Sequence, residues 1–209
     1  MNLVANPPRK TSISDHEKAA SFAQDLPVLT ELKRYVQELV ISSKEKEPDS
    51  PSPAFIYQGF QRLTIATVTP DHRNLRLIVQ DRQALTKAQG FYFVGFFGRK
   101  KPDIKPAISE NLNRLDQTLI KDLEETSPIL SYSSLELPDR YNYANLVLFT
   151  HPDGLKQWKM NNYQHHKASR HISPHYYESV KIHFGSLENG LVSDFRLMHT
   201  SFYDFGWPR

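Results

Sequence analysis

The sequence contains no cysteine among its 209 residues. This absence excludes disulfide bonds, thiolate nucleophiles and metal sites with cysteine ligands. No run approaches the roughly 20 apolar residues needed to cross a bilayer, and the first twenty residues lack the apolar centre of a signal peptide. We therefore expect a soluble, cytoplasmic protein with no membrane partner.

The sequence also lacks a strong excess of either charge. Its 26 basic and 23 acidic side chains leave a net charge of +3. A nucleic-acid-binding domain usually carries clustered Lys and Arg on one face, so we expect no nucleic-acid partner. What the chain does have is 39% hydrophobic residues, 11% of all residues being aromatic. At 24.2 kDa this is enough for one substantial core.

Residues 1–50 form the first of two predicted regions, an N-terminal arm and helix with a linker. The first 25 or so residues are polar without a period and predict a flexible or loosely docked arm. Apolar residues then recur at helical spacing from 28 to 40, with Asp25 as a candidate cap and Pro27 near the first turn. Residues 42–53 combine charge, Ser and three prolines, which predicts a linker.

Residues 54–209 form the second region, which we predict to be an α+β domain. Strands are expected at 54–69, 75–80, 91–97, 129–137, 144–150, 176–185 and 191–205, with helices after 106 and 153. The strand at 91–97 is apolar on both faces, and its Gly95 lets a neighbour approach closely. From residue 90 the element order predicts a ferredoxin-like split βαβ core with an antiparallel sheet.

Nine histidines supply most of the candidate chemistry, and four of them lie between 165 and 175. His165 and His166 are adjacent, so on a helix only one of them can face a given site. His171 and His175 are four residues apart, but Pro174 interrupts a helix through them and no carboxylate lies nearby in sequence. We therefore predict no dedicated metal site. No GxSxG, HExxH or Gly-rich phosphate loop is present, so hydrolase, kinase and dehydrogenase functions lack support.

Residues 90–187 resemble a domain of the dimeric α/β barrel superfamily, of the antibiotic-biosynthesis monooxygenase type. The shared pattern is a strand, a short loop, a helix with an inward Trp, a His near the helix end, and a strand that begins with aromatic residues. In the haem-degrading branch a similar order holds, and here Trp158, Asn161 and His166-Lys167 stand in that order. The resemblance implies a homodimer that closes a barrel from two sheets.

A domain of this shape places its ligand cavity between the sheet and the helices. Alternate strand residues would line that cavity, and they favour a flat aromatic or hydrophobic small molecule. The alternative is that these side chains only fill the core. The predicted substrate-binding residues are Phe91, Phe93, Phe97, Leu148 and Ile182.

The leading hypothesis is a small oxidoreductase of the monooxygenase type, acting on an aromatic or polycyclic substrate. His166 would be the general base or the haem ligand, since imidazole titrates near neutral pH; Trp158 and Asn145 would position the substrate. His171 and His175 are further cofactor-binding candidates, and an inward His199 could also face the cavity. Haem and oxygenation without a cofactor are both allowed. The alternatives are a non-catalytic carrier of haem or another small ligand, and a lyase or cyclase on the same fold.

Overall fold

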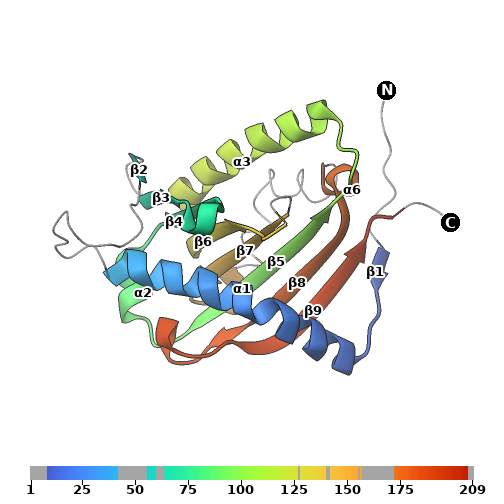
Figure 1. Cartoon of the computed structure of the whole chain (residues 1–209). Coiled ribbons are helices and arrows are strands. Elements are labelled where there is room, and N and C mark those ends of the chain that lie inside the picture. Colours follow the sequence, from blue (N-terminus) through green and yellow to red (C-terminus); the bar gives the residue numbers. More distant parts are fainter. Residues whose placement is uncertain are drawn as a thin grey trace.

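The computed structural model describes residues 9–41, 56–59, 64–126, 128–139, 142–154, 156 and 172–206. Within these residues the chain is an α+β protein built on one antiparallel sheet, as predicted (Figure 1). The predicted linker, Trp158, His166 and His171 lie outside the described residues.

The strands are β1 (Arg9–Thr11), β2 (Ile56–Gly59), β3 (Thr64–Val68), β4 (Leu75–Val79), β5 (Phe91–Lys100), β6 (Ile129–Glu136), β7 (Tyr143–Phe149), β8 (Tyr177–Leu187) and β9 (Arg196–Asp204). The helices are α1 (Asp15–Ile41), α2 (Arg82–Lys87), α3 (Pro106–Thr126) and the short α6 (Ser173–Tyr176), with 3₁₀ turns η1 (Pro70–His72) and η3 (Gly190–Val192).

The described strands follow the order β1-β9-β8-β5-β7-β6-β4-β3-β2. β5 lies between β8 and β7 and is antiparallel to both, and β7 lies between β5 and β6 in the same way. β5 and β6 are therefore parallel with one strand between them, and so are β7 and β8. The 54–69 segment, expected as one strand, contains β2 and β3, which pair with each other and extend the sheet beyond β4.

α1 and α3 cover opposite faces of the sheet, which we name the α1 face and the α3 face (Figure 1). On β5 the odd-numbered residues Phe91, Phe93 and Phe97 belong to the core beneath α1. Successive side chains of a strand alternate between faces, so Tyr92, Val94 and Phe96 lie on the α3 face. A Cβ placed on Gly95 would lie 2.8 Å from a Leu29 methyl carbon, so this glycine is where α1 approaches β5 closely, as predicted.

α1 begins at Asp15, ten residues before Asp25, the predicted cap. The cause is a capping box at Ser14 and Glu17. The Glu17 carboxylate accepts hydrogen bonds from the Ser14 amide at 2.8 Å and the Ser14 hydroxyl at 2.7 Å, while the Ser14 hydroxyl accepts one from the Glu17 amide at 3.3 Å. The first 25 residues are therefore not a loose arm over their described part, because residues 9–11 also pair with β9.

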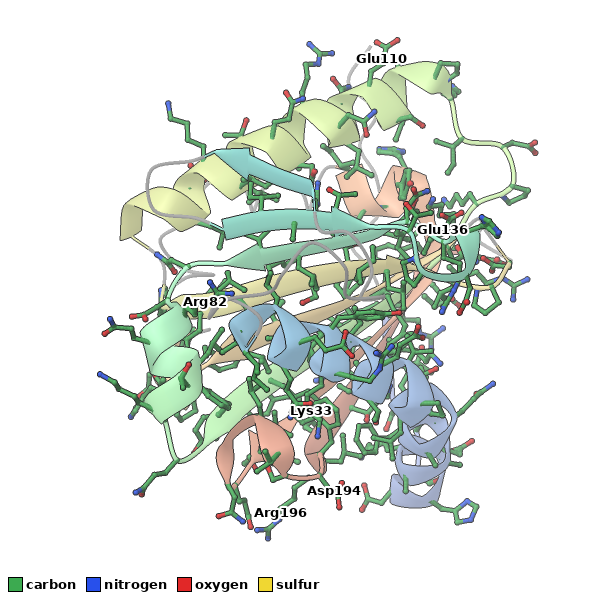
Figure 2. All side chains as sticks on the ribbon, turned by 60° about the vertical axis from the view of Figure 1, so that its left-hand side comes forward. Lys33, Arg82, Glu110, Glu136, Asp194 and Arg196 are labelled. Carbon is green, nitrogen blue, oxygen red and sulfur yellow. The ribbon has the colours of Figure 1, made fainter. Side chains whose placement is uncertain are left out.

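The buried stripe of α1 joins it to the sheet in a single core. Leu29, Leu32, Val36 and Leu39 are fully buried, and each such side chain contributes about 1.5 to 3 kcal/mol relative to an exposed one. Lys33 also points from α1 toward the connection between β8 and β9, where Asp194 lies (Figure 2). Its ammonium group donates a hydrogen bond to the Ser193 carbonyl oxygen, and burial lowers the pKa of Lys33. α1 is thus fixed to the sheet by both apolar and polar contacts.

Candidate functional site on the α3 face

Three aromatic rings stack on the α3 face, namely Tyr92 of β5, Phe149 of β7 and Phe184 of β8. Phe96, four residues along β5, lies on the same face, and we name these four residues the aromatic wall. The Tyr92 ring lies 6.2 Å from that of Phe149 and 6.1 Å from that of Phe184, at interplanar angles of 21° and 16°. Phe149 is fully buried, whereas Tyr92, Phe96 and Phe184 are partly exposed. Rings that are nearly parallel and not completely covered suit a flat apolar guest.

Asn145 of β7 stands beside this wall. It is directly opposite Phe96 on one neighbouring strand and Ser134 on the other, and Phe96 in turn lies opposite Ile182. The Asn145 Oδ1 atom is buried, and the part of the chain that the structure describes gives it no hydrogen-bond partner. Leaving such an acceptor unpaired costs about 1 to 3 kcal/mol, so the position favours a ligand that can donate a hydrogen bond.

The polar end of the same row is Arg76 of β4, which lies opposite Ser134. Its two terminal nitrogens donate to the Asp116 carboxylate of α3 at 2.6 and 2.8 Å, a bidentate ion pair. The Arg76 Nε–H group is buried and, like Asn145 Oδ1, unpaired within the described residues. One row across the α3 face thus runs from a charged pair through an unpaired amide to apolar side chains.

Two tyrosines flank this row. Burial raises the pKa of Tyr132 on β6 to about 12, although the nearby Arg76 opposes the shift. Burial also raises the pKa of Tyr177, whose ring packs edge-on against Phe96 at 5.5 Å. Both phenols therefore stay protonated near neutral pH.

Tyr132 gives a prediction for alkaline pH. A pKa of about 12 in the folded protein and about 10 in the unfolded chain means that stability is complete below pH 10 and falls between pH 10 and 12. The loss reaches up to about 3 kcal/mol. Tyr132→Phe should remove this part of the alkaline loss in urea unfolding at pH 9 and 11.5, whereas Tyr203→Phe should keep it. Equal alkaline loss in the wild type and Tyr132→Phe would contradict the burial of this phenol.

The structure separates the predicted substrate-binding residues. Phe91, Phe93, Phe97 and Leu148 lie under α1 in the main core, whereas Ile182 lies on the α3 face. These five side chains therefore do not line one cavity, and the α3-face neighbours of Ile182 are the even-numbered residues of β5. The prediction assigned the odd-numbered residues of β5 to the same face as Ile182, because this strand is apolar on both faces and its pattern does not show which face is which.

Of the predicted catalytic and cofactor-binding residues, two are described. Asn145 is on the α3 face, on the other side of Phe96 from Ile182, and His175 is half-buried in α6. His166, Trp158 and His171 lie outside the described residues, so the structure does not test their roles. In the part of the chain that is described, no three His, Asp or Glu side chains group as a metal site would require.

The basic residues after residue 98 engage neighbouring elements. Arg99 pairs with Glu178 at 3.0 Å, and the Lys101 ammonium group donates to the Pro174 carbonyl oxygen at 2.8 Å. The Lys100 ammonium lies 4.9 Å from the centre of the Tyr143 ring, and burial lowers the pKa of Lys100. These contacts tie the end of β5 to β7, α6 and β8.

A second polar cluster lies on the α1 face. His183 of β8 is completely buried; its Nε2 lies 2.9 Å from Asp25 Oδ2, and its Nδ1 lies 2.9 Å from Thr200 Oγ1. Lys181 Nζ also contacts Asp25 Oδ2 at 2.5 Å. A carboxylate, imidazole and hydroxyl in this order resemble a catalytic triad, but Thr200 is only 2% exposed. The cluster therefore holds α1 against β8 and β9.

Three comparisons with known proteins bear on the class of this chain. No family model, no curated protein and no solved structure matches it. Within the described residues no helix has the length and apolar character to span a membrane.

Proposed function

We propose that the protein binds a flat aromatic small molecule against the aromatic wall and acts on it as an oxidoreductase of the monooxygenase type. The observation that carries this proposal is the buried Asn145 Oδ1 beside Phe96, which no described residue pairs with a hydrogen bond. Ligand sites typically combine an apolar lining with a few polar groups that fix orientation. Here the wall supplies the apolar lining, and Asn145 supplies the oriented acceptor.

The reaction that suits such a site is oxygenation of an activated carbon next to an aromatic ring. A CH₂ group and O₂ give a carbonyl group and water, and the substrate supplies all the electrons. A base must first remove a proton from that carbon. This route needs no cofactor and uses the wall to hold the ring and Asn145 to orient it.

Haem is the cofactor that the sequence resemblance implies. The wall suits a flat macrocycle, and haem bound there would supply an iron centre for oxygen chemistry. The described histidines, however, lie at the margins of the wall or elsewhere. His183 is on the α1 face, His199 on β9 and His175 on α6, and the others are His16 in α1, His72 in η1 and His151 after β7. None of these lies among the rings of the wall, and His199 is only at its β9 edge, so the described residues do not fit haem there and we derive no step through iron.

The strand order β8-β5-β7-β6 supports a second part of the proposal, a ferredoxin-like core. The homodimer stays a prediction. In the barrels that the sequence resembles, two sheets pair face to face, but here α1 packs over Phe91 and Phe93 and leaves that face no room for a second sheet. A pair formed by this chain would therefore have to use another surface.

Asn145→Ala tests the proposed site directly. We expect it to weaken binding of 2-naphthol about tenfold, because the hydroxyl group loses its acceptor. Binding is followed by naphthol fluorescence, and thermal unfolding reports the fold. Asn113→Ala, an exposed residue of α3, is the matched control and should bind as the wild type does.

Haemin addition separates the versions of this function. A Soret shift that bleaches with reductant and oxygen supports haem degradation, and a stable Soret band supports a haem carrier. No shift removes haem from the proposal. Equal naphthol affinity in Asn145→Ala and the wild type, or no naphthol binding at all, would contradict the site.

A further inference from the structure

His199 and Ser201 stand at the β9 end of the aromatic wall. His199 is directly opposite Phe184, and Ser201 is directly opposite Ile182, so both share the α3 face with the wall. Thr200 between them faces the other way and contacts His183. The wall therefore has an imidazole along one side, carried by the strand next to Phe184.

The two side chains hydrogen-bond to each other: His199 Nε2 lies 2.8 Å from Ser201 Oγ. In the tautomer with the proton on Nε2, the imidazole donates to the Ser201 hydroxyl, and Nδ1 carries a lone pair. The described chain gives Nδ1 no hydrogen-bond partner, and the His199 side chain is exposed. Ser201, only 9% exposed, can thus hold the ring in place while Nδ1 stays accessible.

The surroundings of His199 favour its neutral form. Partial burial lowers its pKa, and so do the cations Lys10 of β1 and Lys18 of α1. Lys18 is also paired with Asp15 at 2.6 Å. A neutral imidazole accepts a proton, and the same two cations favour a negative charge that develops on a bound substrate.

We propose that His199, oriented by Ser201, is the general base of the α3-face site. This inference rests on the proposed function. The step moves one proton from an acidic carbon next to the substrate's ring to His199 Nδ1. The C–H electron pair stays on the substrate as an enolate, and the imidazolium later returns the proton to solvent. The substrate class is therefore a flat aromatic compound with an enolisable benzylic position.

2-Tetralone is a suitable probe, because its benzylic CH₂ group is enolisable and its proton exchange needs no oxygen. Under argon in D₂O, proton NMR follows the exchange of that CH₂ group, and saturation-transfer NMR follows binding. We expect saturable exchange in the wild type that falls as the pH is lowered and the imidazole protonates. His199→Ala should slow exchange at least about a hundredfold with little change in binding.

Added imidazole should restore exchange in His199→Ala, which a structural role for His199 would not allow. Ser201→Ala should lower the exchange rate and leave binding intact, and His72→Asn, at an exposed histidine, should behave as the wild type does. If the wild type does not bind 2-tetralone, the proposed function fails together with this inference. If it binds but exchange is absent, or is equal in His199→Ala, only the role of His199 is overturned.

Discussion

Replacing Asp25 with alanine should lower the free energy of unfolding by about 3 to 5 kcal/mol. Asp25 accepts from both His183 and Lys181 in a buried position, with Oδ2 at 2.9 and 2.5 Å from their nitrogens. Alanine leaves the partly buried Lys181 ammonium group without its counter-charge and the buried His183 N–H group without its acceptor. Urea unfolding followed by circular dichroism measures the change.

Two further variants locate the cause of that loss. Asp25→Asn keeps an acceptor for His183 but removes the charge opposite Lys181, so we expect a smaller loss than for alanine. Asp103→Ala, at an exposed carboxylate, should change stability by no more than about 0.5 kcal/mol. A loss in Asp25→Ala no larger than in Asp103→Ala would contradict the polar attachment of α1 to β8.

The second large effect separates the two faces of β5. Phe93→Ala should cost about 3 to 5 kcal/mol of stability, because Phe93 is fully buried beneath α1 and its removal leaves a cavity. Phe96, three residues along the same strand, lies on the α3 face and is partly exposed. Phe96→Ala should cost less stability and weaken binding of 2-naphthol about tenfold or more, since the wall loses one ring.

Urea unfolding and naphthol fluorescence of the two variants form one comparison. The account requires that stability responds most at Phe93 and ligand affinity most at Phe96. The reverse order would assign the ligand to the α1 face.

The strand 91–97 explains why the predicted lining residues were divided between two faces. Period-two alternation identifies a buried face only where the other face is polar, and this strand is apolar on both. Its existence and its burial were therefore predictable, but its orientation depends on α1. Gly95 indicated that a neighbour approaches the strand closely, but the sequence did not show that this neighbour is Leu29 of α1.

A local capping motif sets the start of α1, and the sequence contains that motif. Ser14 and Glu17 have the spacing of a capping box, and this outweighs the polar composition of residues 15–24. Asp25 was interpreted as a cap because it precedes the apolar stripe. Its actual partners are on β8, more than 150 residues away in sequence, and no local pattern reveals such a contact.

In the candidate site, too, some residues were predictable from the sequence and others were not. Asn145 was predicted from a resemblance, and the structure places it beside Phe96 with a buried oxygen that no described residue pairs. Arg76, Phe96 and Ser201 were not singled out, because a single Arg on a strand or a Ser two residues from a His is common in sequences. Only the pairing of β4, β6, β7, β5, β8 and β9 brings these side chains onto one face.

The most direct test of the central claim is the dissociation constant of 2-naphthol for Phe96→Ala. The account predicts an increase of about tenfold or more over the wild type, with the protein still folded by circular dichroism. An unchanged dissociation constant in folded Phe96→Ala would contradict the claim that the aromatic wall is the ligand-binding surface of this protein.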